Sequence, residues 1–297
     1  MNVALFQSNL FAEETLGSAQ PPRGQLLKWI GNKHRLASQI VALFPADMRA
    51  YWEPFLGGGA VLATLAPSRG FASDAFPPLI EIWRTLKTKP DELKAWYRER
   101  WEHFRSGDRV ERYEEIKRRF NASPNGADLL FLCRSCYGGV VRFRKADGYM
   151  STPCGIHSPI APDRFSARVD DWRRRIVGSE FALSHFADAM RRTRTGDVVY
   201  CDPPYSHTQA ILYGAQSFSF ESLLDEIAAC KARGVRVLLS IDGTKKSGAH
   251  SCDLPIPDGL FAREVFLSIG RSMLRRFQLP GQSLEAEEVS ERLLLTF

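Results

Sequence analysis

The sequence has no apolar run near the roughly 18 residues that a membrane-spanning helix needs. Its first 25 residues lack the basic and apolar regions of a secretory signal peptide. Six cysteines among 297 residues are too few for a disulfide framework, which fits a reducing compartment. From these absences we expect a cytoplasmic protein that has no membrane as a partner.

Motifs of several common enzyme classes are also missing. There is no HExxH zinc site, no G-x-S-x-G nucleophile elbow and no G-x-G-x-x-G dinucleotide fingerprint. Cys133 and Cys136 have metal-ligand spacing, but no second pair follows, and Cys154 and His157 would complete a site only through the fold. We therefore predict no bound metal and interpret the cysteine pair as buried or helical.

The sequence does contain an alternation of strand-like and helix-like segments. Residues 50–66 and 70–87 each show a short apolar strand, a special turn and a helix. Residues 196–205 end another strand in Asp-Pro-Pro-Tyr, and residues 219–242 give a helix that stops at Gly234 and then a strand. This alternation predicts a three-layer α/β fold with a largely parallel, Rossmann-like sheet.

The alternation breaks between residues 88 and 195. A densely charged stretch predicts two amphipathic helices that separate near Ser106, and a glycine- and proline-rich stretch after them resembles a loop or hairpin. We interpret residues 88–180 as a mainly helical insertion in a discontinuous domain formed by residues 1–87 and 181–297.

Basic charge is concentrated in this insertion. The chain has a formal net charge of +6, and residues 134–175 hold nine Arg or Lys against four Asp, which is 9 − 4 = +5. Such a segment favours a polyanionic partner, nucleic acid first. The alternative is a solvated basic face that has no partner.

Two stretches favour a nucleotide-like cofactor. In "EPFLGGGAVL" three glycines let the backbone approach a ligand at a helix start, and Asp74 ends the next strand, where ribose hydroxyls are commonly bound. The alternative is a tight structural turn. In "LLKWIGNKHRLASQIVALFP", Lys33 leads into a predicted helix, either as a solvated lysine or beside a carboxylate or ligand.

The Asp-Pro-Pro-Tyr run stops a strand directly after a carboxylate. Pro203 and Pro204 fix the backbone and supply no N–H, so neither a helix nor a sheet ladder continues from them. The Asp202 carboxylate and the Pro203 carbonyl make two adjacent acceptors that suit a planar NH2 group, and Tyr205 suits stacking on the base that carries it. The alternative is a rigid turn with an exposed acid.

The stretches "LLKWIGNK", "YWEPFLGGGAVL", "SDAF" and "DPPY", in this order, resemble the DNA adenine methylase (Dam) family of N6-adenine DNA methyltransferases in its alpha-group arrangement. The resemblance runs from about residue 26 to the end of the sequence. It implies an S-adenosylmethionine-dependent methyltransferase sheet with a target-recognition insertion, and methyl transfer from S-adenosylmethionine to N6 of an adenine flipped out of double-stranded DNA. We expect a monomer, with a separately encoded cognate restriction endonuclease as an optional partner.

The resemblance assigns roles to individual residues. The catalytic group is Asp202, Pro203, Pro204 and Tyr205. Cofactor contacts are expected from Trp29, Lys33, Glu53, Phe55, Gly57, Gly59, Asp74 and Asp202. DNA contacts are expected from Tyr137, Arg142, Arg144 and Lys145. The chain departs from the family at Ile30 and Asn32, and it has "SIDGTKK" in place of an "SNHD"-like segment, so no contact is carried over to residues 240–246.

Three rival hypotheses remain. A methyltransferase for N4 of cytosine or for a protein glutamine is disfavoured by Asp202, where Ser or Asn would be expected, and by the basic insertion. A dinucleotide oxidoreductase lacks its glycine fingerprint. A catalytically silent DNA-binding protein on the same fold would be distinguished by cofactor titration.

Overall fold

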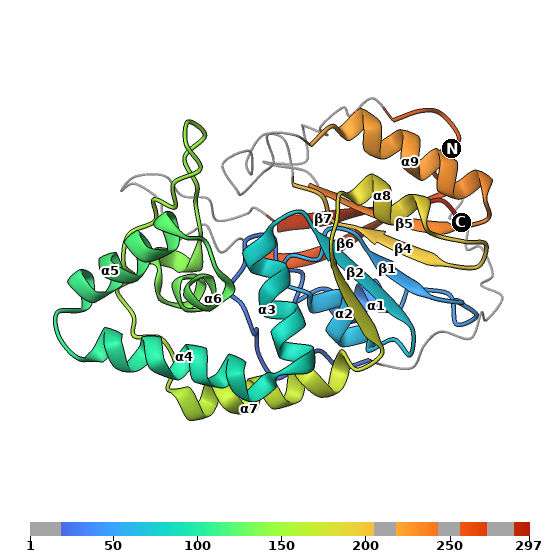
Figure 1. Ribbon diagram of the computed structural model, residues 1–297. Coiled ribbons are helices and arrows are strands. Elements are labelled where there is room, and N and C mark those ends of the chain that lie inside the picture. The colour runs from blue at the N-terminus through green and yellow to red at the C-terminus, as the bar shows by residue number, and fades with distance from the viewer. Residues whose placement is uncertain (1–18, 205–217, 243–255, 272–287) are drawn as a thin grey trace.

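A computed structural model describes residues 19–204, 218–242, 256–271 and 288–297 (Figure 1). Its centre is a seven-stranded sheet in the order β3-β2-β1-β4-β5-β7-β6. The strands are β1 (Tyr51–Glu53), β2 (Gly70–Asp74), β3 (Ser179–Leu183), β4 (Val198–Cys201), β5 (Arg236–Asp242), β6 (Arg263–Arg271) and β7 (Glu288–Leu295). The first five strands pair in parallel, and β7 runs antiparallel between β5 and β6. The predicted, largely parallel α/β sheet is confirmed.

Helices cover both faces of the sheet. They are α1 (Ala37–Val41), α2 (Ala60–Leu65), α3 (Pro77–Thr88), α4 (Pro90–Arg105), α5 (Arg109–Ala122), α6 (Gly126–Ser135), α7 (Pro162–Arg175), α8 (Phe186–Arg191) and α9 (Phe220–Ala232), with a 3-10 turn η1 (Tyr137–Gly139). Figure 1 shows α8 and α9 on one face, α1 to α3 on the other, and α4 to α6 in a lobe beside the sheet. The helix and strand predicted for 219–242 are α9 and β5, and Gly234 follows the helix with φ 74°.

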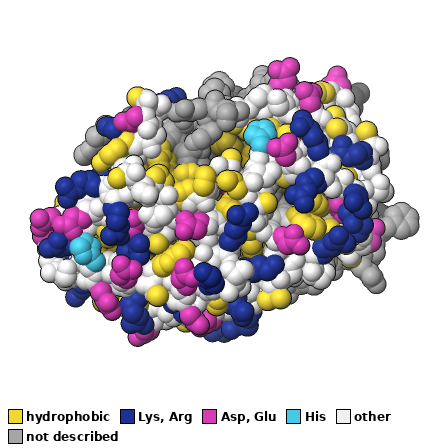
Figure 2. Space-filling model, in the orientation of Figure 1, with side chains coloured by type: hydrophobic (Ala, Val, Ile, Leu, Met, Phe, Trp, Pro, Cys, Tyr) yellow, Lys and Arg dark blue, Asp and Glu magenta, His cyan; other side chains and the backbone are white. Residues whose placement is uncertain are grey.

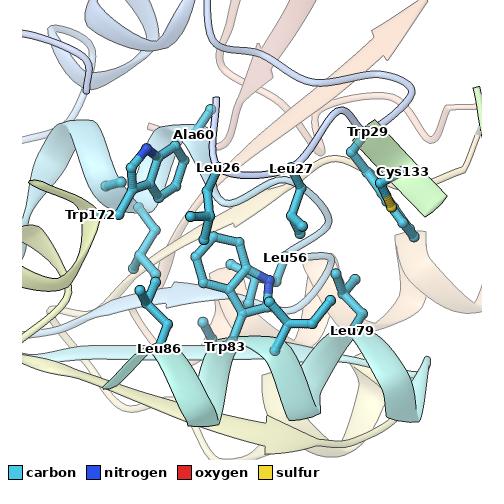
Figure 3. Packing of buried hydrophobic residues seen from close by; sticks show 14 of the residues in the cluster. Leu26, Leu27, Trp29, Leu56, Ala60, Leu79, Trp83, Leu86, Cys133 and Trp172 are labelled. Carbon is cyan, nitrogen blue, oxygen red and sulfur yellow. The ribbon is translucent and has the colours of Figure 1, made fainter. Parts of the chain in front are cut away.

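Central strand β4 is buried on both faces, which explains its continuous apolar composition. Val198 and Tyr200 pack into one apolar cluster, with α1 to α3, whereas Val199 and Cys201 pack into the other, with α8 and α9. In the first cluster Trp83 on α3 is fully buried, among residues that include Leu26 and Leu56 (Figure 3).

The insertion is held together around one buried carboxylate. Asp128 on α6 is fully buried and accepts hydrogen bonds from Arg100 on α4 at 2.7 Å and from Arg119 on α5 at 2.8 Å. Asp108 caps α5 by accepting from the backbone N–H groups of the second and third residues after it. Helices α4 and α5 separate at Ser106, as predicted.

The structure differs from the sequence expectations in several elements. The insertion contains α6 and α7 in addition to the two predicted helices. Helix α1 begins at Ala37, so Lys33 lies in a turn before the helix and not at its start. Strand β3 and helix α8 were not foreseen as elements, and β3 crosses the predicted boundary between residues 180 and 181. The division of the chain into domain and insertion stays a prediction.

Candidate active site

A cleft lies at the carboxyl ends of β1, β2 and β4 and has a volume of about 910 Å3, open mouth included. In the sheet order, β1 and β4 form the point at which the chain switches direction across the sheet, where α/β proteins bind ligands. All eight residues predicted to contact the cofactor line the cleft: Trp29, Lys33, Glu53, Phe55, Gly57, Gly59, Asp74 and Asp202.

The other predicted catalytic residues are Pro203, Pro204 and Tyr205. Pro204 also lines the cleft, and Pro203 is buried beside it. Tyr205 lies outside the described residues.

The glycine turn after β1 admits only glycine at two positions. Gly57 and Gly59 have φ angles of 46° and 61°, in the left-handed region. A Cβ at residue 59 would lie 2.7 Å from the Trp83 ring, and one at residue 57 would lie 3.1 Å from Trp29. The bare backbone of this turn therefore forms one wall of the cleft.

Asp74, at the end of β2, is fixed beside the glycine turn. Its two carboxylate oxygens accept from the N–H groups of Gly57 and Phe76, each at 3.1 Å. Burial raises the pKa of Asp74 to about 6, although these N–H groups favour the charged form. Each oxygen retains a second lone pair, so the side chain can also accept from a ligand hydroxyl.

Glu53, at the end of β1, has an unusual protonation state. The Tyr51 hydroxyl donates to it at 2.7 Å. Burial raises the pKa of Glu53 to about 8, the Asp202 charge adds to this shift, and the Tyr51 hydrogen bond opposes it. Glu53 is therefore mostly neutral at pH 7 and able to donate a hydrogen bond.

Asp202 is paired with a lysine that is 169 residues away in the sequence. Lys33 Nζ lies 2.8 Å from Asp202 Oδ1 and 3.3 Å from Glu291 Oε1 on β7. Burial alone would lower the pKa of Lys33, but the two carboxylates outweigh burial and raise it. Of the two roles left open for Lys33, the structure supports the one beside a carboxylate.

Two aromatic side chains that line the cleft were not predicted from the sequence: Phe186 on α8 and Phe218 before α9. Phe186 stacks on Phe55 with ring centroids 5.2 Å apart, and Phe218 meets Phe55 edge-on at 5.8 Å. Ser184 and His185 line the same side. Recognition of β3 as a strand would have placed the segment after it at the ligand-binding edge of the sheet.

The predicted DNA-contacting residues lie on the insertion, outside the cleft. Residues 142–151 form a short hairpin in which Phe143 pairs with Met150, and it projects from the insertion lobe (Figure 1). Arg142, Arg144 and Lys145 are exposed on it. Arg144 donates to both carboxylate oxygens of Asp147, at 3.0 and 2.5 Å. Tyr137, which precedes the hairpin, is 43% exposed.

Part of the basic charge counted in residues 134–175 is structural, so not all of it lies on the surface of the protein. Arg134 is buried, and its guanidinium donates to the Gln25 and Leu26 carbonyls, each at 2.9 Å. Arg168 donates to the same Gln25 carbonyl. In the face shown in Figure 2, basic and acidic side chains are intermixed over the insertion. The exposed basic residues of this segment are Arg142, Arg144 and Lys145 on the hairpin and Arg164, Arg173 and Arg174 on α7.

Two further observations concern the described residues only. Within these ranges no helix is both long enough and apolar enough to cross a membrane. In the same part of the chain, no group of three or more His, Cys, Asp or Glu side chains is placed to hold a metal ion.

The sheet order, the cleft at the switch point and the acids at the ends of β2 and β4 are consistent with the fold of S-adenosylmethionine-dependent methyltransferases. Within this class, residues 29–270 match the family model of the D12 class N6 adenine-specific DNA methyltransferases, and the chain belongs to that family. The predicted family and the adenine-specific DNA methyltransferase activity are thereby confirmed.

Curated relatives agree with this assignment. The chain is 28% identical to a DNA adenine methylase of Vibrio cholerae over 72% of its length and 79% of the relative. It is 30% identical to a DNA adenine methylase of Salmonella typhi, covering 68% and 74% of the two chains. A type II methyltransferase of Lactococcus lactis is 28% identical, with 72% and 79% covered. Among solved structures, an rRNA methyltransferase of Streptomyces viridochromogenes aligns over 88% and 84% of the two chains with 12% identity and a TM-score of 0.38.

Proposed function

We propose that the cleft binds S-adenosylmethionine and that Asp202, with the Pro203 carbonyl, binds the N6 amino group of an adenine flipped out of duplex DNA. The observation that carries the proposal is the position of Asp202. Its carboxylate ends the central strand β4, lines the cleft and is oriented by the Lys33 ammonium at 2.8 Å.

Different residues of the cleft suit different chemical groups of S-adenosylmethionine. The bare backbone of Gly57 and Gly59 admits the cofactor close to β1, and Asp74 has acceptor capacity for ribose hydroxyls. Phe55 and Phe186, which stack on each other, add apolar ring surface to the cleft wall for an adenine base. When bound, S-adenosylmethionine supplies a methyl group on a positively charged sulfur.

Asp202 and Pro203 would act where charge develops. As the N6 lone pair would bond to the methyl carbon, the carbon–sulfur bond would break and the sulfur would leave as a neutral thioether. N6 would carry the positive charge until it loses one proton to solvent, and a carboxylate that accepts one N–H stabilises that charge. The Pro203 carbonyl accepts the second N–H, so both hydrogens are held and the lone pair is aimed at the methyl group. Tyr205 is proposed to stack on the flipped base.

An adenine within a duplex cannot reach this cleft, so the base has to leave the helix. We place the DNA contacts on the hairpin, with Arg142 and Arg144 as candidates for reading base edges and Lys145 as a phosphate contact. Tyr137 is placed on the same surface.

The enzyme is proposed to act as a monomer on cytoplasmic DNA. The type II methyltransferase among its relatives supports pairing with a separately encoded restriction endonuclease, and solitary action is the alternative.

The test is methylation of a mixed-sequence duplex DNA library with S-adenosylmethionine carrying a deuterated methyl group. Mass spectrometry of the digested nucleosides should find the label in N6-methyladenine, and sequencing should place it at one short motif. Label in N4-methylcytosine would overturn the proposed base, and label absent from all nucleosides would overturn the proposed reaction. Single-stranded DNA of the same composition controls for the duplex requirement.

A further inference from the structure

We propose that Glu291, on β7, is a positioning residue for methyl transfer. It shares the Lys33 ammonium with Asp202, so that Lys33 orients Asp202 without neutralising it completely. The inference rests on the proposed function of Asp202. Glu291 is not among the residues to which the family resemblance assigned a role.

The contacts of Lys33 leave little freedom to its ammonium group. An ammonium has three donors, and within the described part of the chain it has acceptors in Asp202 Oδ1 at 2.8 Å, the Gly31 carbonyl at 3.1 Å and Glu291 Oε1 at 3.3 Å. The Lys33 side chain is only 7% exposed. The ammonium is therefore held at a fixed position from which it orients the Asp202 carboxylate.

Glu291 is itself anchored in the sheet. It lies on β7, which pairs with β5, and the Ser240 hydroxyl of β5 donates to the same Glu291 oxygen that faces Lys33. Both side chains are buried. Asp202 is thus connected through Lys33 and Glu291 to Ser240, on the strand next to its own.

The charges around Lys33 explain why the Glu291 carboxylate would affect methyl transfer. With Glu53 mostly neutral at pH 7, Lys33, Asp202 and Glu291 sum to +1 − 1 − 1 = −1. Without the Glu291 charge these described groups sum to zero, and of the two carboxylates described beside the ammonium Asp202 would be the one left to compensate it. A less negative Asp202 would stabilise the cation that develops at N6 less well.

The experiment measures single-turnover methyl transfer at saturating DNA and S-adenosylmethionine. Glu291→Gln keeps the shape and loses the charge, and we expect a rate on the order of tenfold lower, smaller than the loss from removing a direct acceptor. Dissociation constants for donor and DNA should stay within about threefold of the parent, because the proposed effect acts only where N6 becomes cationic. Glu264→Gln, an exposed carboxylate of β6 paired with Arg292, is the matched control and should keep the parental rate.

A second measurement uses the protein without cofactor. Thermal unfolding of Glu291→Gln, Lys33→Gln and the double variant should give non-additive shifts in melting temperature, because the two side chains are in contact. In the transfer assay the double variant should be no slower than the slower single variant.

The outcomes separate the inference from the function on which it rests. An active parent with a folded Glu291→Gln variant of parental rate would overturn the positioning role alone. A rate loss explained entirely by weaker donor or DNA binding would overturn it as well, as would rate losses that multiply in the double variant. A parent that methylates no adenine would overturn the proposed function, and the positioning role with it.

Discussion

Phe143 of the hairpin lies edge-on against Phe76, with ring centroids 5.5 Å apart. Phe76 precedes α3, and its backbone N–H donates a hydrogen bond to Asp74. The Trp29 ring packs beside the Phe76 ring, with ring centroids 6.4 Å apart. The hairpin that carries the candidate DNA contacts therefore packs directly on the rim of the cleft. The candidate DNA contacts are thus carried by an element that packs next to the cleft into which a flipped base would have to enter.

The hairpin arginines should separate into two kinds. Arg142→Ala or Arg144→Ala is expected to cost about 1–3 kcal/mol at one base position of the recognition site. Lys145→Ala should weaken binding to every sequence. The plot of the logarithm of the binding constant against the logarithm of the salt concentration should become less steep, by about 0.9 in slope. The measurement is methylation of the cognate site and its single-base variants at two salt concentrations. Arg164→Ala, an exposed arginine of α7, is the control, and parental behaviour in all three hairpin variants would move the recognition surface elsewhere.

Donor affinity should depend on the ionised form of Asp74. Because its folded pKa is about 6, S-adenosylmethionine affinity is expected to fall as pH decreases through 6. Asp74→Asn should lower the affinity about 10- to 100-fold at pH 7.5, the range of a hydrogen bond to a charged group, and should remove this pH dependence. Calorimetry without DNA measures both. A variant with parental affinity and a parental pH profile would refute the ribose contact.

Glu53 should make folding stability depend on pH. Its folded pKa of about 8 lies above that of an unfolded glutamate, so its contribution is fully present below about pH 4.5 and is lost as pH rises through 8. Relative to the permanently neutral Glu53→Gln variant, the parent should lose more than about 1 kcal/mol of unfolding free energy between pH 5 and pH 8. Urea unfolding at several pH values checks this, and a constant difference between the two proteins would mean that Glu53 is ionised throughout.

Asp128 should be essential to the stability of the insertion. Asp128→Ala leaves Arg100 and Arg119 without their shared carboxylate, at an expected cost of about 3–5 kcal/mol. Asp170→Ala breaks only the exposed pair with Lys94 and should cost less than about 1 kcal/mol. Urea unfolding of the two variants tests the contrast, and equal losses would show that burial of Asp128 is not decisive.

Much of the site could be predicted from the sequence, because it is built from strand ends and from a glycine turn, each of which has a local sequence pattern. Asp74 and Asp202 each end a strand, and parallel strands end at one edge of the sheet, so their meeting in the cleft follows from the α/β pattern. The glycine turn belongs to the same edge.

The residues that the sequence analysis missed depend on pairings distant in sequence. Glu291 reaches Lys33 only because β7 inserts antiparallel beside β5, and strand pairing of this kind leaves no local signal. Arg134 was included in the basic charge of residues 134–175, but it is buried, and a count of charges along the sequence cannot show burial. Helix α1 is shorter than its apolar spacing indicated because residues 30–36 form turns.

The most direct test of the central claim is the single-turnover rate of Asp202→Ala on cognate duplex DNA, with circular dichroism to verify the fold. We expect the rate to fall about 10²-fold or more, because a key charge-stabilising acceptor is removed. Asp258→Ala, an exposed carboxylate in a turn, should transfer at the parental rate. A folded Asp202→Ala enzyme within tenfold of the parent would contradict the role assigned to this carboxylate.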